Sequence, residues 1–222
     1  MCQAPEKVDN KILNYKSKYL IFFLPKLGLD RNKLQLTTIG EYSITHHEVS
    51  AEISAIIREQ MKGKKGLVIT DATAGMGGDT IVFAHDFEKV NAIEMNDLHC
   101  KVLKNNIGVY GLKNVNVICG DYTKLMDEIE QDILFMDPPW SGREYKSIDK
   151  LKLCLSGLDV ADITNKVKAK LVALKVPHNF DFEDFKKKVK GKMTVYNFKR
   201  FDLIVVKKGK NGVARVRIRY DK

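Results

Sequence analysis

The fold is indicated most strongly by residues 66–84, which read GLVITDATAGMGGDTIVFA. Residues 66–71 are mostly apolar and β-branched, as in a buried strand. Glycines at Gly75, Gly77 and Gly78 then allow the backbone to turn sharply and to approach a ligand closely. The apolar residues that follow, 81–84, indicate the start of a helix. A strand, a glycine loop and a helix in this order are the context of a nucleotide-binding fingerprint, although a structural turn explains a lone glycine loop equally well.

Further predicted strands follow along the chain, and each ends at an acid. The strands are expected at 90–93, 115–119 and 132–136, and the acids after them are Glu94, Asp121 and Asp137, while the first strand ends at Asp71. Open α/β sheets bind ligands outside the carboxyl ends of their strands. An acid about twenty residues beyond the loop can accept ribose hydroxyls, and Asp121 can accept from an adenine amino group. The pattern predicts S-adenosylmethionine as the cofactor, with no metal.

The fourth strand runs directly into Asp137-Pro138-Pro139-Trp140. An exocyclic nucleobase amine is a weak nucleophile, because its lone pair is delocalised into the ring. The Asp137 carboxylate and the Pro138 carbonyl can accept its two N–H groups, and the prolines stiffen the turn. Trp140 offers a face on which a base can stack. The tetrapeptide therefore predicts methylation of a nucleobase amine, with an ordinary turn as the alternative.

Together these elements predict an α/β fold, the class I (Rossmann-like) S-adenosylmethionine-dependent methyltransferase. Its mostly parallel seven-stranded sheet, with a fifth strand at 171–176, is expected to end in an antiparallel hairpin around Lys210-Asn211-Gly212, because Asn-Gly is a strong hairpin signal. Residues 1–10 are predicted to be disordered, residues 11–62 to form an N-terminal helical extension, and residues 63–222 to form the methyltransferase core.

Two helices are expected within the N-terminal extension. Residues 11–24 carry apolar side chains at helical spacing, and Pro25 ends the pattern. Thr45 and Glu48 predict a capping box at the start of a second helix, which would end near Gly63.

The composition of the chain indicates the kind of binding partner and the cellular compartment. The 222 residues carry a net charge of +10 from 38 basic and 28 acidic side chains. This excess favours an anionic partner, with nucleic acid as the default candidate and mere solubility as the alternative. The four cysteines show no paired spacing, so the sequence predicts neither a zinc site nor a disulfide framework, and it favours a reducing compartment. With no long apolar run and no signal-peptide pattern, we expect a soluble, intracellular monomer.

Several motifs, spread over residues 19–200, resemble the trimethylguanosine synthases, the RNA cap guanine-N2 methyltransferase family. The stretches that carry the resemblance are Tyr42–Thr45, Asp71–Ile81, Phe83-Ala84, Asn105-Asn106, Val109–Gly111, Ile118–Asp121 and Asp137–Tyr145. Few other nucleobase methyltransferases combine the Val-Tyr-Gly segment with Pro-Pro-Trp. The resemblance identifies the chain as a minimal catalytic domain that acts on a capped RNA or a cap nucleotide.

The resemblance also implies roles for individual residues. The predicted cofactor site comprises Thr45, Asp71, Thr73, Gly75, Gly77, Glu94, Asp121, Tyr122 and Asp137. The predicted catalytic residues are Asp137, Pro138 and Trp140. The predicted substrate site, for a 7-methylguanosine cap stacked on Trp140, comprises Trp140, Arg143, Tyr145, Lys175, His178 and Asn179.

Two positions depart from the pattern of the family. Asp137 stands where many members have Ser, and both side chains can accept from an amine. His178 stands where the family has an Arg that serves the cap phosphates, so Lys175, Arg143 or Lys146 are expected to compensate.

Other functions remain open at this point. One is methylation of guanine N2 or adenine N6 in tRNA, rRNA or DNA. Another is a catalytically silent RNA-binding subunit. A small-molecule methyltransferase is a further possibility, which the positive charge and the Pro-Pro turn disfavour.

Overall fold

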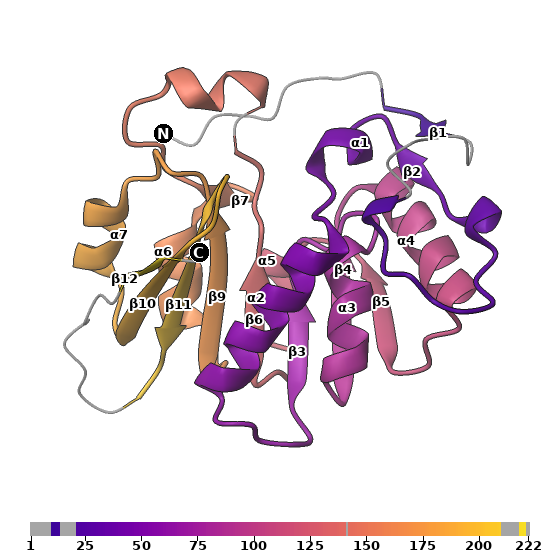
Figure 1. Ribbon diagram of the computed structural model, residues 1–222. Coiled ribbons are helices and arrows are strands. Elements are labelled where there is room, and N and C mark those ends of the chain that lie inside the picture. The colour runs from indigo at the N-terminus through magenta and orange to yellow at the C-terminus, as the bar shows by residue number, and fades with distance from the viewer. Residues whose placement is uncertain (1–9, 14–20, 141, 210–217, 221–222) are drawn as a thin grey trace. The chain divides into compact units, whose positions relative to one another are not determined.

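The computed structural model describes residues 10–13, 21–140, 142–209 and 218–220 (Figure 1). It divides into two compact units: the first unit spans Val8–Tyr122 and the second contains Thr123–Lys222. The predicted boundary at residue 62 falls inside the first unit, so the division between extension and core stays a prediction. Of the residues predicted to be disordered, 1–9 lie outside the described part of the chain.

The first unit contains a parallel sheet, whose strands are β3 (Val68–Asp71), β4 (Lys89–Glu94) and β5 (Val115–Cys119). β4 pairs in parallel with both of the others. Helix α3 (Gly78–Asp86) connects β3 to β4, and α4 (Asp97–Tyr110) connects β4 to β5. The predicted alternation of strands and helices is thus confirmed here. Strand β4 is buried along almost its whole length, as expected of a parallel strand covered on both faces.

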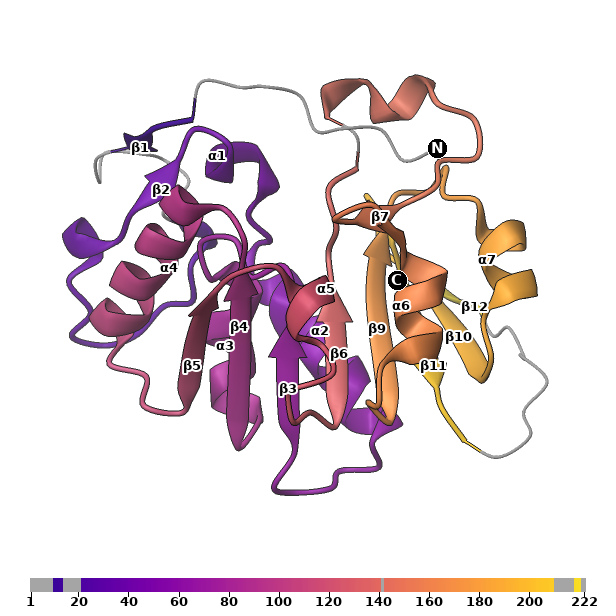
Figure 2. The same cartoon turned by 180° about the vertical axis from the view of Figure 1, so that it is seen from behind.

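Helix α2 (His47–Gln60) covers the same face of this sheet as α3, as both views show (Figures 1 and 2). It buries Ile53, Ile56 and Ile57, which the sequence places on one helical face. The start of α2 differs from the predicted capping box. His46 is the N-cap, and its Nδ1 accepts from the Glu48 N–H at 3.3 Å.

The N-terminal extension is not purely helical, although the sequence predicts a helical extension. Ile12–Leu13 form strand β1, which pairs antiparallel with β2 (Leu36–Thr37). The predicted helix therefore does not start at Lys11, and its residues 14–20 lie outside the described chain. Pairing with a distant strand overrides the helical spacing of these residues, because strand formation depends strongly on the partner. A 3-10 turn at Arg31–Lys33 and helix α1 (Gly40–Ser43) complete this region.

The sheet of the second unit is mixed. Strands β6 (Ile133–Met136) and β9 (Leu171–Val176) pair in parallel. β9 then pairs antiparallel with β11 (Asp202–Lys207), and β11 pairs antiparallel with β10 (Lys192–Asn197). Helix α6 (Val160–Lys166) lies on one face of this sheet (Figures 1 and 2). This unit also contains a 3-10 helix (Arg143–Ser147), β7 (Cys154–Leu155), β8 (Leu158–Asp159), α7 (Phe182–Lys188) and β12 (Ile218–Tyr220).

The predicted C-terminal hairpin is present, but its turn lies elsewhere. β10 and β11 are joined at residues 198–201, where the Phe198 N–H donates to the Phe201 carbonyl at 2.9 Å and the two rings stack with centroids 4.5 Å apart. In the described strands, β12 pairs in parallel with β10. A hairpin between β11 and β12 around Lys210-Asn211-Gly212 was therefore wrong, and those three residues lie outside the described chain. The aromatic pair closes the real turn without a glycine.

Helices of the described residues all lack the length and hydropathy that a membrane span requires. In the same residues, no three His, Cys, Asp or Glu side chains gather as they do around a metal ion. The predicted intracellular location and monomeric state remain predictions.

Candidate active site

The glycine loop lies between β3 and α3, as predicted, and two of its glycines differ in role. Gly75 has a φ of +51°, and a side chain there would meet only the Thr73 carbonyl, at 4.0 Å. Gly77 has a φ of +95°, and a Cβ there would lie 3.0 Å from the Leu103 side chain. Gly75 therefore borders open space that a ligand can use. Gly77 is required by its backbone conformation and by core packing, and its contact with the cofactor stays a prediction.

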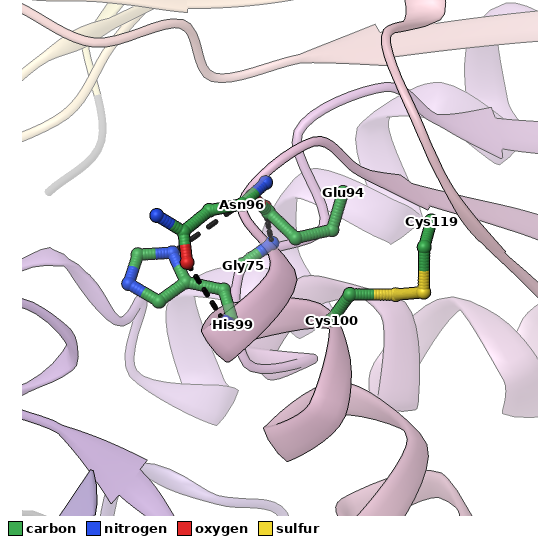
Figure 3. The surroundings of a disulfide bond; sticks show 6 residues. All are labelled: Gly75, Glu94, Asn96, His99, Cys100 and Cys119. Atoms are coloured by element: carbon green, nitrogen blue, oxygen red, sulfur yellow. Dashed lines mark hydrogen bonds and ion pairs between the residues drawn. A yellow bond between two sulfur atoms is a disulfide. The ribbon is translucent and has the colours of Figure 1, made fainter. Parts of the chain in front are cut away.

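Glu94 ends β4 beside this loop (Figure 3). Its Oε2 accepts from the Gly75 N–H at 2.9 Å, and its Oε1 accepts from the Asn96 N–H at 2.8 Å. The side chain is only 10% exposed, with His99 Nδ1 3.8 Å from Oε1. Burial raises the pKa of the Glu94 carboxyl, and the backbone N–H donors of Asn96 and Gly75 oppose that rise. A fixed carboxylate next to a glycine loop suits the hydroxyls of a ribose.

Asp71 and Thr45 contribute to the shape of the loop. Asp71 is buried; its Oδ2 accepts from Thr80 Oγ1 at 2.6 Å and its Oδ1 from the Thr73 N–H at 3.3 Å. Thr45 Oγ1 donates to Asp79 Oδ2 at 2.9 Å. These bonds hold the loop and the start of α3 together. Direct cofactor contacts of Thr45, Asp71 and Thr73 stay predictions.

Asp121 and Tyr122 follow β5 and end the first unit. The Gly120 N–H donates to the Glu94 carbonyl at 2.9 Å, which ties the end of β5 to the end of β4. Asp121 is partly buried, whereas Tyr122 is 1% exposed and opens helix α5 (Tyr122–Leu125). The first unit thus presents acids at its neighbouring strand ends, as the sequence predicts.

A disulfide joins Cys100 and Cys119, contrary to the prediction of no disulfide framework (Figure 3). Cys100 lies in the first turn of α4, and Cys119 is the last residue of β5. Helix α4 starts just after the carboxyl end of β4, and β5 is the parallel neighbour of β4. The first turn of α4 therefore lies close to the carboxyl end of β5. The two Cα atoms are 5.7 Å apart although 19 residues separate the cysteines. The fold brings these two cysteines together, so their spacing in the sequence does not reveal the disulfide. With this disulfide present, the cysteines no longer indicate a reducing compartment.

Removing this bond is expected to destabilise the protein by about 3 kcal/mol, because closing a loop of this length restricts the unfolded chain. We expect the double variant Cys100→Ser/Cys119→Ser to unfold at a lower denaturant concentration than the oxidised wild type. Denaturant unfolding followed by circular dichroism measures the difference. Equal free energies of unfolding would show that the bond contributes nothing.

Cofactor binding is expected to weaken as the pH falls from neutrality through the raised pKa of Glu94. Ribose hydroxyls donate to the ionised carboxylate, so binding favours the ionised form and releases a proton on the acid side. Glu94→Gln should lower affinity roughly ten- to a hundredfold, since hydrogen bonds to a charged group are strong. It should also abolish the proton release. Calorimetry in buffers of different ionisation enthalpy measures both, with the exposed Glu88→Gln as control; proton release that persists in Glu94→Gln would contradict this assignment.

In the second unit, an ion pair lies where β6 ends. Asp137 follows β6, and its Oδ2 is 2.7 Å from Lys175 Nζ, with the two side chains 19% and 8% exposed. The same ammonium lies 5.9 Å from the centroid of the Trp140 ring and 5.1 Å from that of Phe201. Lys175 thus faces a carboxylate and two aromatic rings, and this geometry lends no support to its predicted contact with cap phosphates.

Trp140 is partly buried and packs edge-to-face on Tyr145, with ring centroids 5.3 Å apart at 70°. Its Nε1–H group is buried and has no hydrogen-bond partner in the described part of the chain. Asn179 Nδ2 donates to the Tyr145 carbonyl at 2.7 Å and to the Ile148 carbonyl at 2.6 Å. This amide fixes the short 3-10 helix Arg143–Ser147. The structure thereby brings Trp140, Tyr145 and Asn179 together, with Asn179 as the residue that positions Tyr145.

The predicted phosphate-binding cations are less well defined. His178 Nδ1 lies 3.1 Å from Asp202 Oδ2, and the His178 side chain is 53% exposed. Lys146 is exposed, with Nζ 6.0 Å from the Tyr145 ring centroid. The side chain of Arg143 lies outside the described structure. Phosphate binding by these residues stays a prediction.

Sequence reasoning missed Phe201, Asn96 and His99 as neighbours of the two sites. Phe201 reaches Lys175 only because β11 pairs with β9. Asn96 is the N-cap of α4, directly after the acid at the end of β4, and Asn is a preferred N-cap residue. That local signal would have found Asn96.

The fold and these strand-end acids define a class I S-adenosylmethionine-dependent methyltransferase. The 16S rRNA N2 methyltransferase of T. thermophilus, solved with AdoMet and guanosine, has a similar fold: the TM-score is 0.61 at 15% identity, over 93% of this chain and 52% of that one. Residues 66–215 match the RNA cap guanine-N2 methyltransferases, so the chain belongs to that family. The predicted fold, family and cofactor are confirmed, and Glu94 beside the open space at Gly75 fits that cofactor.

Two proteins are similar to this chain in sequence. An uncharacterized protein of Acanthamoeba polyphaga mimivirus is 40% identical over 152 residues, which are 65% of this chain and 59% of that protein. Trimethylguanosine synthase of Schizosaccharomyces pombe is 30% identical over 111 residues, which are 47% of this chain and 45% of the yeast protein. The chain spans about half the length of these curated relatives.

Proposed function

We propose that this protein transfers a methyl group from S-adenosylmethionine to the exocyclic N2 of a 7-methylguanosine RNA cap. Membership of the RNA cap guanine-N2 methyltransferase family supports this reaction, as does the similarity to a trimethylguanosine synthase. The observation that carries the proposal is the aromatic corner of Trp140 and Tyr145 directly after Asp137 and Pro138. A base stacked in that corner would have its amine next to the two acceptors.

Asp137 and the Pro138 carbonyl would accept the two N–H groups of the amine and so localise its lone pair. S-adenosylmethionine supplies an electrophilic methyl group when bound. Holding the reacting atoms in line at short range provides most of the rate enhancement. As the amine nitrogen is alkylated it becomes acidic, and its proton leaves to Asp137 or to water, so no strong base is needed.

Trp140 would recognise the methylated base. N7-methylguanine is cationic, and Trp is the best side chain for stacking on a cation. Within the described residues the buried Nε1–H of Trp140 has no hydrogen-bond partner, and buried polar groups in folded proteins nearly always have one, so this group would donate to a ligand atom.

Mass spectrometry of 7-methyl-GDP incubated with the protein and S-adenosylmethionine tests this proposal. We expect 7-methyl-GDP to gain the mass of one or two methyl groups, and only when the cofactor is present. Unchanged 7-methyl-GDP, with a protein that binds the cofactor, would contradict the proposal.

A second candidate is guanine-N2 or adenine-N6 methylation in tRNA, rRNA or DNA. It is favoured by the net charge of +10 and by the fold shared with a 16S rRNA N2 methyltransferase. Such an enzyme needs no methylated cap, so methylation of tRNA or rRNA in place of a free cap analogue would establish it. Cofactor binding without turnover on any of these substrates would instead indicate a silent RNA-binding subunit.

A further inference from the structure

We infer that the Asp137–Lys175 ion pair sets the charge of the base site and so determines how strongly it prefers a cationic base to a neutral one. Lys175 would be a specificity-determining residue that acts through Asp137 and Trp140. The inference rests on the proposed function, because it takes the stacked ligand to be a guanine with or without an N7 methyl group.

The pair is fixed by the sheet. Met136 of β6 is opposite Leu174 of β9 in the parallel register, so Asp137 and Lys175 come next on neighbouring strands. Their oxygen and nitrogen atoms are 2.7 Å apart, and both side chains are largely buried. Neither charge is well solvated, so each depends on the other for compensation.

The same two strands carry a matching pair at their other ends. Lys170 Nζ lies 2.5 Å from Asp132 Oδ1, just before β9 and β6 begin, but the Lys170 side chain is 63% exposed. Solvent screens such a pair, and exposed ion pairs contribute little. This pair is a natural control, because it has the same residue types on the same strands but its lysine is exposed, whereas Lys175 is buried.

The position of the ammonium bears on the base. Lys175 Nζ is 5.9 Å from the centroid of the Trp140 ring, within the range of a cation–π contact. A cationic base stacked on Trp140 would interact with the same aromatic ring, and the positive charge of Lys175 would repel it. Asp137 offsets that charge, so the intact pair leaves the site near neutrality and open to a cation.

Removing either member of the pair should therefore shift the preference between a cationic and a neutral base, and the two removals should shift it in opposite directions. Without Lys175, the Asp137 carboxylate attracts a cationic base more strongly than a neutral one. Without the Asp137 charge, the Lys175 ammonium repels the cationic base. Over a separation of about 6 Å, an uncompensated charge in a partly buried site changes the ratio of two affinities on the order of tenfold.

The test is equilibrium binding of 7-methyl-GTP and GTP to the full chain without S-adenosylmethionine, because the methyl donor would convert 7-methyl-GTP during the measurement. The quantity compared is the ratio of the two affinities in wild type, Lys175→Gln, Asp137→Asn and the double variant, with Lys170→Gln as the matched control. Both ligands carry the same exocyclic amine and the same phosphates, so lost hydrogen bonds cancel in the ratio. Thermal unfolding and cofactor affinity establish that each variant is folded.

We expect the ratio to move toward 7-methyl-GTP on the order of tenfold in Lys175→Gln and toward GTP by a similar factor in Asp137→Asn. The double variant should return close to wild type, and Lys170→Gln should not differ from it. An unchanged ratio in both single variants, or a shift of both in one direction, would overturn the inference. If Lys175→Gln does not fold, Asp137→Asn and the double variant decide it.

The outcome for the proposed function is read separately, from wild type alone. Equal wild-type affinity for both nucleotides would contradict cap recognition, while opposite shifts in the variants would still support the role of the pair. Folded wild-type protein that binds neither nucleotide would overturn both.

Discussion

Asp137→Ala is expected to lower turnover by about 10²–10³-fold and to leave the affinity for S-adenosylmethionine at the wild-type level. Asp137 lies at the end of β6, where its proposed role is to orient the target amine and to receive its proton. Positioned acid–base groups contribute factors of about 10²–10⁴, and the neighbouring Pro138 carbonyl would retain part of the alignment.

The variant also leaves the buried Lys175 without its carboxylate partner, which costs stability. Single-turnover rates at saturating cofactor and 7-methyl-GTP should therefore be measured together with the thermal unfolding of each variant. Asp132→Ala is the matched control, because Asp132 precedes the same strand and pairs with the exposed Lys170. The control should turn over like wild type. If folded Asp137→Ala did so as well, the amine-aligning role would be excluded.

Trp140→Ala should weaken the binding of 7-methyl-GTP by about ten- to a hundredfold, which corresponds to about 1–3 kcal/mol of stacking and cation–π energy. GTP should lose less, because a neutral base gains only the stacking part. Trp140→Phe should retain some of the affinity, since a smaller ring still packs against Tyr145. The structural basis is the edge-to-face contact with Tyr145, at 5.3 Å between centroids.

Equilibrium binding of 7-methyl-GTP and GTP to the three proteins measures this effect. Tyr145→Phe is the control, because it keeps the ring that supports Trp140 and removes only a hydroxyl. It should bind like wild type. Retention of the full preference for 7-methyl-GTP in Trp140→Ala would mean that another group reads the N7 methyl.

Most strands and helices could be predicted because their signals are local. The apolar runs at β3, β5, β6 and β9 and the glycine loop carry their own periodicity and turn chemistry. The errors share one cause, which is a partner that is distant in sequence. Ile12–Leu13 pair with β2, and Thr45 donates to Asp79 rather than capping α2.

The residues of the candidate site likewise divide into those with a local sequence signal and those that depend on a partner distant in sequence. Glu94 and Asp137 could be placed from the sequence, because Glu94 ends one predicted strand and Asp137 directly follows another, and open α/β sheets bind ligands outside the carboxyl ends of their strands. The contact between Lys175 and Asp137 depends on the register of β6 and β9, which no local pattern fixes. The same holds for Asn179, whose amide holds the backbone of Tyr145.

The most direct measurement of the central claim is wild-type turnover of 7-methyl-GTP against GTP, with S-adenosylmethionine, under identical conditions. A cap guanine-N2 methyltransferase should methylate 7-methyl-GTP and leave GTP unchanged. Equal turnover of the two nucleotides, or methylation of neither while tRNA or rRNA is modified, would contradict cap specificity and move the activity to another RNA.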